Sequence, residues 1–318
     1  MIDTVRISGD YEISDEMLYV IPWTNNYAVN ASDDNGFFGE RFFYREKGQL
    51  LSVEYASETK KLSIETSIPR FLFGNNVQMI AGHEIEIFFH RLNDFLREKF
   101  YAYPRHDWTS CQVHRMDVCW NFQVGDLVAD YIQAFGNIYL PRYTTRTYGG
   151  GETVEWSNKS KRMSFYDKKK EVRKRKRDEQ VIEMARGILR FEVNLKGYDL
   201  KKVSPKKWAG ELLSEEVAKH FLHSHLQKLG IDKQLTICNQ LEVIGKLCKA
   251  YDYNKAQQLF GFIHFYQLLG REAIMEQLSA STYDRRMKDL NKVGLAPMFS
   301  TKELPPLDLS FIENLNLS

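Results

Sequence analysis

The sequence has 318 residues, of which 43% are hydrophobic and 13% are aromatic. A chain of this length and composition can bury a full core in one or two domains, which excludes an intrinsically disordered protein. The formal net charge is only +2 despite 44 lysine and arginine residues. Any affinity for nucleic acid must therefore come from local basic clusters rather than from the field of the whole protein.

The four cysteines form neither a CxxC motif nor a cysteine/histidine zinc spacing. We expect reduced, buried thiols in a cytoplasmic protein; these residues are Cys111, Cys119, Cys238 and Cys248. The first residues lack the basic and apolar regions of a secretory signal, and no apolar run approaches ~20 residues. The sequence therefore predicts neither secretion nor a membrane-spanning helix.

Residues 1–70 are predicted to be rich in β-strands. Residues 3–8 alternate between polar and apolar types, and LLSVEYA and KLSIETS read as paired strands that reverse near residues 58–60. Alternation places Glu65 on the polar side of its strand. A helix is predicted from about residue 78 to 99, because apolar residues recur there every three or four positions.

The segment CQVHRMDVCWNFQV is the clearest strand in the chain. Its alternation places His114 and Met116 on one face and Arg115 and Asp117 on the other. Aspartate is depleted in strand interiors. Asp117 is therefore expected to have an arginine partner, a structural hydrogen bond or a metal ion, and a helix is predicted over residues 126–136.

Residues 153–177 are predicted to form a strand, a basic turn, a second strand that ends on Tyr166, and a cationic helix. Alternation puts Tyr166 on the polar face, and a helix this basic can follow a phosphate backbone. The expected phosphate contacts are Arg162, Lys170, Arg173, Lys174 and Arg175. We predict that Tyr166 attacks a DNA phosphate; the alternative is a half-buried strand tyrosine beside a solvated charged helix.

The strand GILRFEVNLKG repeats the polar pattern of CQVHRMDVCWNFQV, with Arg190 and Glu192 in the places of Arg115 and Asp117. Two carboxylates on neighbouring strands can form an oxygen-rich site for Mg²⁺ or Mn²⁺. The bound ion would stabilise the negative charge of a phosphoryl transition state. A tyrosine with a pKa of ~10 is a poor nucleophile. Cationic neighbours would favour its phenolate, and the candidates are Lys168, Lys169 and Arg162.

Residues 204–318 are predicted to be mainly helical, with an irregular tail after residue 296. A second basic cluster precedes them and consists of Lys196, Lys201, Lys202, Lys206 and Lys207. The pair His223 and His225 is not expected to bind metal, because residues two apart on a helix point away from each other. Residues 271–295 have the size of a helix-turn-helix, although many helical hairpins share the pattern. The expected DNA contacts of residues 271–295 are Arg285, Arg286 and Lys288.

The order of several short motifs is more specific than any one of them. MIDTVRI, PRFLFGNNV, HRMDVCWNF, TVEW, FYDKKKE and GILRFEVNL follow one another in a way that resembles the replication initiators of filamentous phages, the gene II/X protein family. The chain is more loosely similar to the replication initiators of rolling-circle plasmids. The resemblance covers roughly residues 1–200, and STYDRRMKDLNKVGL looks like the C-terminal end of the family.

The resemblance implies an α+β catalytic core like that of the HUH nucleases, with a largely antiparallel sheet flanked by helices. The expected division is a catalytic domain over residues 1–203 and a helical, DNA-binding domain over residues 204–318. The implied function is a site-specific endonuclease that nicks one strand of a double-stranded origin. Tyr166 would form a 5′-phosphotyrosyl link, leave a free 3′-OH and later allow the strand to be rejoined.

By the same resemblance, Asp117 and Glu192 match the acidic positions that hold a divalent metal. The paired histidines of HUH nucleases are missing; the candidates for a third ligand are His114, Glu65, Glu155 and Glu171. Tyr143 or Tyr148 could act as a second tyrosine. The expected partners are double- and single-stranded origin DNA, a host helicase and a polymerase in the cytoplasm. The alternatives are a DNA-binding regulator without enzymatic activity and a metal nuclease that uses water.

Overall fold

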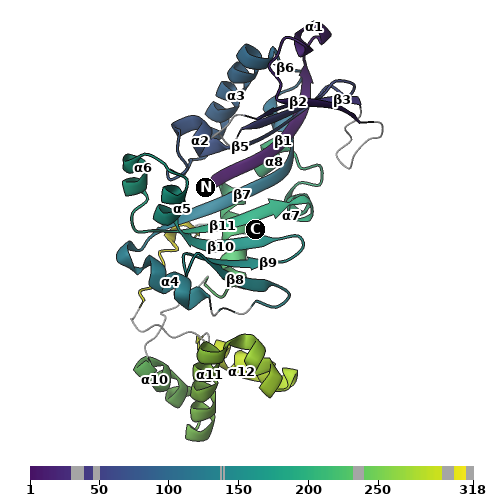
Figure 1. Ribbon diagram of the computed structural model, residues 1–318. Coiled ribbons are helices and arrows are strands. Elements are labelled where there is room, and N and C mark those ends of the chain that lie inside the picture. Colours follow the sequence, from purple (N-terminus) through teal and green to yellow (C-terminus); the bar gives the residue numbers. More distant parts are fainter. Residues whose placement is uncertain are drawn as a thin grey trace. The chain divides into compact units, whose positions relative to one another are not determined.

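The computed structural model describes residues 1–29, 39–45, 51–136, 138, 140–231, 240–295 and 304–312. Within them the strand order is β2-β3-β4-β5-β1-β7-β11-β10-β9-β8, and β6 pairs with β1 (Figure 1). The strands are β1 (Ile2–Glu12), β2 (Asn25–Val29), β3 (Gly39–Arg45), β4 (Ser52–Ala56), β5 (Lys61–Ser67), β6 (Tyr103–Pro104), β7 (Gln112–Gln123), β8 (Thr144–Tyr148), β9 (Thr153–Ser157), β10 (Arg162–Asp167) and β11 (Ile188–Lys196).

The predicted α+β class with a largely antiparallel sheet is confirmed, since the pairs β1–β5, β1–β7, β3–β4 and β9–β10 are all antiparallel. The helices are α1 (Asp15–Leu18), α2 (Ile68–Phe73), α3 (Glu84–Phe100), α4 (Val128–Phe135), α5 (Lys168–Lys174), α6 (Glu179–Met184), α7 (Gly197–Val203), α8 (Ala209–Leu212), α9 (Glu215–Lys228), α10 (Gln240–Ala250), α11 (Tyr253–Gln277) and α12 (Ala280–Lys292). Among the described residues, none of these helices has the length and apolar character needed to cross a bilayer.

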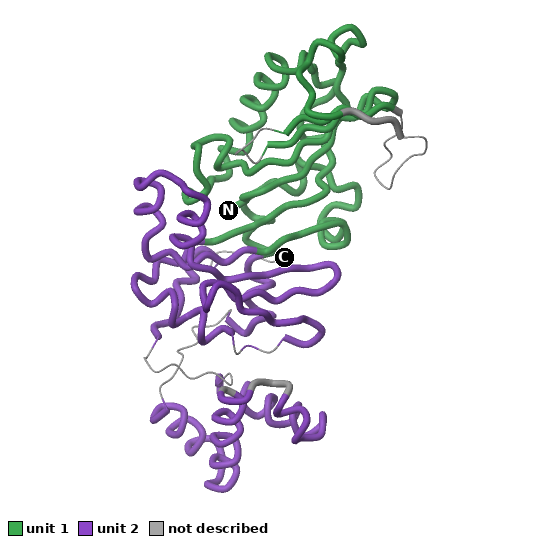
Figure 2. The backbone as a smooth tube through the Cα atoms, viewed as in Figure 1, with its two compact units in different colours: residues 1–120, 193–221 green, residues 121–192, 222–318 purple. Residues whose placement is uncertain are grey.

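The chain forms two compact units, residues 1–120 with 193–221 and residues 121–192 with 222–318 (Figure 2). These units reflect compactness rather than function. The expected boundary at residue 203 between a catalytic and a DNA-binding domain therefore stays a prediction, as does the closer likeness to the HUH nucleases.

In the first unit, β1 lies between β5 and β7, so that Arg6 is opposite Glu65 on one side and Arg115 on the other. Helix α3 buries its apolar stripe and receives a hydrogen bond of 3.0 Å from the Tyr11 hydroxyl to Asn93. The predicted helix over 78–99 begins late, at Glu84. The Glu84 carboxylate fixes the turn before it by accepting a hydrogen bond of 2.6 Å from the Ala81 amide.

In the second unit, β9 and β10 form the predicted hairpin, with Tyr166 opposite Thr153. Met163 and Phe165 are fully buried, as their alternation predicts, whereas Tyr166 is half-buried. The Phe165 ring stacks on Phe191 of β11, with 4.6 Å between ring centroids. The basic helix is shorter than predicted: α5 ends at Lys174, since Lys176 has a left-handed backbone with φ 52°.

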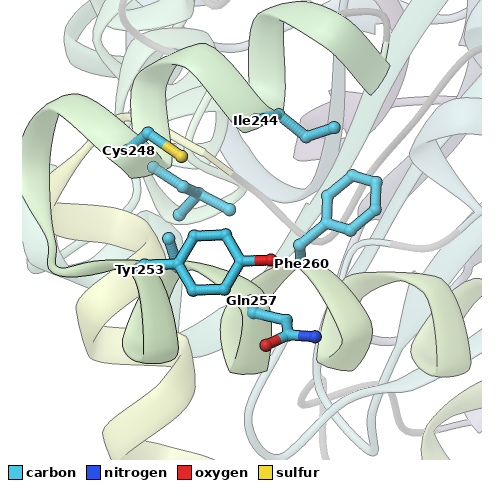
Figure 3. Close-up of a pocket in the computed structure, with 7 residues that line it drawn as sticks. Ile244, Cys248, Tyr253, Gln257 and Phe260 are labelled. Atoms are coloured by element: carbon cyan, nitrogen blue, oxygen red, sulfur yellow. The ribbon is translucent and has the colours of Figure 1, made fainter.

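Helices α10, α11 and α12 share a hydrophobic core that includes Leu247, Ile263 and Tyr283. Between α10 and α11 lies an apolar cavity of about 180 Å³, into which Tyr253 and Phe260 project (Figure 3). Buried cysteines were expected throughout, and this is wrong for Cys248, which is exposed on this cavity. Cys111 and Cys119 are buried, and Cys238 lies outside the described residues.

The tail packs more closely than its sequence predicts. Residues 304–312 contain a single β-bridge at Leu304 and a 3-10 turn at Ser310–Ile312, yet Leu304 is fully buried and Leu307 and Leu309 nearly so. The Tyr131 hydroxyl of α4 donates a hydrogen bond to the carbonyl of Pro305. Burial raises the pKa of Tyr131 to about 12, which keeps its phenol protonated and able to donate.

This packing predicts a structural role for the tail. Replacing Leu304 by alanine should lower the free energy of unfolding by about 2–5 kcal/mol, because it leaves a cavity in a buried site. The matched control is Leu241→Ala on α10, where the leucine is 81% exposed and the change should stay within about 0.5 kcal/mol. Urea unfolding followed by circular dichroism measures both, and equal effects would contradict a docked tail.

Candidate active site

Tyr166 lies near the end of β10, and its hydroxyl donates a hydrogen bond of 2.8 Å to Oε2 of Glu192 on β11. Tyr166 is half-buried, as is Glu192. Strand alternation places both side chains on the polar face, while Phe165 and Phe191 face the core. The predicted nucleophile and one predicted acidic residue therefore form a direct contact.

Lys168 is the first residue of α5 and is fully buried. Its ammonium lies 2.8 Å from Glu171 and 5.8 Å from the centroid of the Tyr166 ring. A buried ammonium needs such a carboxylate partner. Lys169 takes a different direction, with its ammonium 3.8 Å from Glu183 of α6. Of the two predicted catalytic lysines, Lys168 therefore lies beside Tyr166.

Asp117 lies in the first unit and is 1% exposed. Arg115 binds both of its oxygens, with 3.0 Å from Nε to Oδ1, and the Asn194 amide also donates to Oδ1. The same guanidinium reaches Glu65 with an Nη1–Oε1 distance of 2.7 Å. This is the arginine pair that the sequence leaves open as one role of Asp117.

His114, the other predicted metal ligand in this region, lies on the same strand. Its Nε2 is 2.7 Å from the Ser8 hydroxyl. Strand alternation places it on the face opposite Asp117. Within the described part of the chain, no three His, Cys, Asp or Glu side chains come together in a group that could hold a metal ion.

The carboxylates as arranged do not fit a divalent cation well. Both oxygens of Asp117 are bound by Arg115, whose positive charge would oppose a second cation at the same atoms. One oxygen of Glu192 accepts the hydrogen bond from Tyr166. Glu155 and Glu171, the other candidate ligands of this unit, lie near Arg162 and Lys168 respectively. The expected Mg²⁺ or Mn²⁺ therefore stays a prediction.

Most of the predicted phosphate-binding cations around α5 have acidic partners within the protein. Lys170 and Lys174 both pair with Glu152, and Arg175 pairs with Glu171 at 2.5 Å. The hydrogen bond from Lys174 lowers the pKa of Glu152, so this carboxylate stays ionised at neutral pH. The cations of this region for which no carboxylate partner occurs among the described residues are Arg173, Lys176 and Arg177.

Helix α12 begins at the predicted serine turn, where Ser279 caps it by accepting a hydrogen bond from the Thr282 amide. Arg285 and Lys288 are exposed on this helix. Arg286 instead packs its guanidinium over the Phe262 ring, 5.4 Å from the centroid. Two of the three predicted DNA contacts of this segment are thus directed to solvent.

Tyr143 and Tyr148, the candidates for a second catalytic tyrosine, differ in their surroundings. Tyr148 is 44% exposed at the end of β8, and its hydrogen bond with Arg146 raises the pKa of that arginine. Tyr143 lies just before β8 and is half-buried. Whether either takes part in chemistry stays a prediction.

The comparison with protein families agrees with the order of the motifs in the sequence. The family model for the N-terminal region of the gene II replication-associated protein matches residues 15–225. No curated protein matches the chain. A rolling circle replication initiator protein from Geobacillus stearothermophilus is similar in structure, with 12% identity, a TM-score of 0.33, and coverage of 72% of this chain and 84% of that one. The family match confirms the resemblance carried by the motifs, and the chain belongs to the family of gene II replication-associated proteins.

Proposed function

We propose that this protein initiates rolling-circle replication by nicking one strand of a double-stranded origin with Tyr166. Membership of a replication-associated family supports the role in replication. The observation that carries the chemistry is the hydrogen bond of 2.8 Å between the Tyr166 hydroxyl and Glu192. A nucleophilic hydroxyl within hydrogen-bond reach of a base is the arrangement that covalent catalysis requires.

In the proposed reaction, Glu192 takes the proton of the Tyr166 hydroxyl as the phenolic oxygen attacks phosphorus. A bond forms between that oxygen and phosphorus, and the bond from phosphorus to the 3′ oxygen breaks. The 3′ oxygen takes a proton from water and becomes the free 3′-OH that a polymerase can extend, while Glu192 returns its proton to water. The energy of the broken phosphodiester is kept in the phosphotyrosyl bond, so that the strand can later be rejoined.

Lys168 supports the same step by its charge. Its ammonium lies 5.8 Å from the centroid of the Tyr166 ring, and the residue is fully buried. Charges act more strongly where water is excluded, so this cation favours the negative charge that develops on the phenol. We assign Lys168 a positioning and electrostatic role. Lys169 pairs with Glu183 instead and receives no catalytic role.

Origin DNA is the proposed partner of the surface cations. Arg173, Lys176 and Arg177 bind phosphates first, because no carboxylate among the described residues competes for them. Lys170, Lys174 and Arg175 can follow by exchanging their carboxylate partners for phosphates. Arg285 and Lys288 on α12 add a second contact region. A host helicase and a polymerase remain expected partners of the replication reaction.

Nicking is expected to depend on the hydroxyl of Tyr166. Tyr166→Phe should abolish nicking of a supercoiled plasmid that carries the origin, while leaving origin binding unchanged, because only the attacking oxygen is lost. Mass spectrometry of the digested wild-type reaction should find a nucleotide on Tyr166. The control is Tyr103→Phe, a strand tyrosine that is 53% exposed. Nicking that survives Tyr166→Phe would indicate attack by water, and binding without any nicking would indicate a regulator.

Glu192 is expected to act as the base. Glu192→Gln keeps a hydrogen-bond acceptor for Tyr166 but cannot take its proton, and should lower the nicking rate by about 10²- to 10⁴-fold. Origin affinity and thermal stability should change little. Glu98→Gln on α3 is the control, since Glu98 is exposed and has no assigned role in the reaction. A Glu192→Gln variant that nicks at the wild-type rate would refute the role of Glu192 as base.

The two roles left open for Asp117 give different outcomes when it is replaced. As the buried acceptor for Arg115 and Asn194, Asp117→Ala should lower the free energy of unfolding by about 1–3 kcal/mol, because both donors lose their partner while Glu65 still balances the charge of Arg115. A metal ligand would instead give a stable protein with weak nicking. Chemical denaturation measures the first effect. Nicking after chelation, with and without added Mg²⁺ or Mn²⁺, measures the requirement for a cation directly.

A further inference from the structure

The second basic cluster differs from the first in how its charges are balanced. It spans α7 and the residues that lead to Trp208, and contains Lys196, Lys201, Lys202, Lys206 and Lys207. Among the described residues, none of these five lysines forms an ion pair, whereas most cations of α5 do. The cluster is therefore a patch of positive charge that the rest of its unit leaves uncompensated.

The like charges of this cluster affect one another. Partial burial, and then the charge of Lys201, lower the pKa of Lys207. Its backbone is also in the left-handed region, with φ 59°. The Lys207 carbonyl accepts a hydrogen bond of 2.8 Å from the Val113 amide of β7, so this end of the cluster is fixed on the sheet. An anion bound here would relieve the repulsion between the lysines.

Two aromatic side chains accompany the lysines. Tyr198 on α7 is 70% exposed, and the ammonium of Lys202 lies over its ring, 4.7 Å from the centroid. Trp208 is half-buried, with the Lys206 ammonium 5.9 Å from its ring. Alternating cations and accessible rings are the features with which proteins bind single strands, since phosphates meet the charges and unpaired bases stack on the rings.

A cavity of about 340 Å³ opens beside Trp208. Its wall includes Gln112, Lys61 and Asp10, which offer hydrogen-bond donors and acceptors, and Asp10 is paired with Lys61 at 2.7 Å. Trp208 is held in place by its bridge to Gln112 and by the hydrogen bond of 2.8 Å from the Ala209 amide to the Cys111 carbonyl. A half-buried indole on a fixed backbone next to a polar cavity suits a base that has left its stack.

We propose that residues 196–208, with the cavity beside Trp208, form a binding site for single-stranded DNA. Tyr198 and Trp208 stack on unpaired bases, and Lys201, Lys202 and Lys206 bind the adjoining phosphates. A duplex keeps its bases stacked within the helix, so it can use the lysines but not the rings. The choice of DNA rests on the proposed function, because nicking and replication produce a displaced single strand, whereas the site itself does not depend on Tyr166.

The test uses the full chain with Tyr166→Phe, so that no cleavage occurs, and measures the anisotropy of labelled oligodeoxythymidine. Tyr198→Ala should weaken binding by roughly 5- to 150-fold, through the loss of stacking on one base. Tyr198→Phe should bind within about twofold of the parent. Replacing Lys202 and Lys206 together by glutamine should lower the slope of log affinity against log salt concentration by about 1.4.

Lys249→Gln, an exposed lysine of α10, is the control and should leave both affinity and slope unchanged. Unchanged affinity for the oligomer in Tyr198→Ala would overturn the proposal. An equal loss of affinity for duplex DNA of the same length in that variant would also overturn it, because a duplex is not expected to use the rings. Tighter binding of an RNA oligomer would assign the site to RNA instead and also overturn it. Because every variant carries Tyr166→Phe, these results stand apart from whether Tyr166 nicks DNA.

Discussion

The hydrogen bond between Tyr166 and Glu192 is the interaction on which the proposed chemistry depends. A phenol keeps its proton at neutral pH and attacks phosphorus slowly unless a base removes that proton. The strands that carry the two residues hold them in contact through their own core. Phe165 stacks on Phe191 directly behind the polar face, and Trp156 anchors β9 by donating to the Ile138 carbonyl at 3.0 Å. Sites built on packed strands in this way hold their geometry more precisely than sites on loops.

Helix α5 joins this core to the charged surface. Asp167 caps the helix by accepting a hydrogen bond of 3.1 Å from the Lys170 amide, immediately after Tyr166 in the chain. The first turn then directs Lys168 inward, while Arg173 and Lys174 are exposed further along. One short helix thus supplies a buried charge beside the phenol and exposed charges for a phosphate backbone.

Charge balance distinguishes the two basic clusters. Glu152 and Glu171 neutralise much of the α5 region, so DNA binding there requires an exchange of partners. The lysines of residues 196–207 have no such partners among the described residues, and two of them lie over aromatic rings. The first cluster suits a phosphate held near a reacting centre. The second, with lysines outside ion pairs beside aromatic rings, suits the phosphates and unpaired bases of a single strand.

The sequence by itself determined the β9–β10 hairpin, the burial of Met163 and Phe165, and the family, because alternation and motif order are local properties of a chain. It also identified Tyr166 and Glu192 as candidates without showing that they touch. Only the tertiary structure decided that contact, the pairing of Asp117 with Arg115 and the docking of residues 304–312. Local sequence patterns predict which face of a strand a side chain lies on, but not which side chain from another element it contacts there.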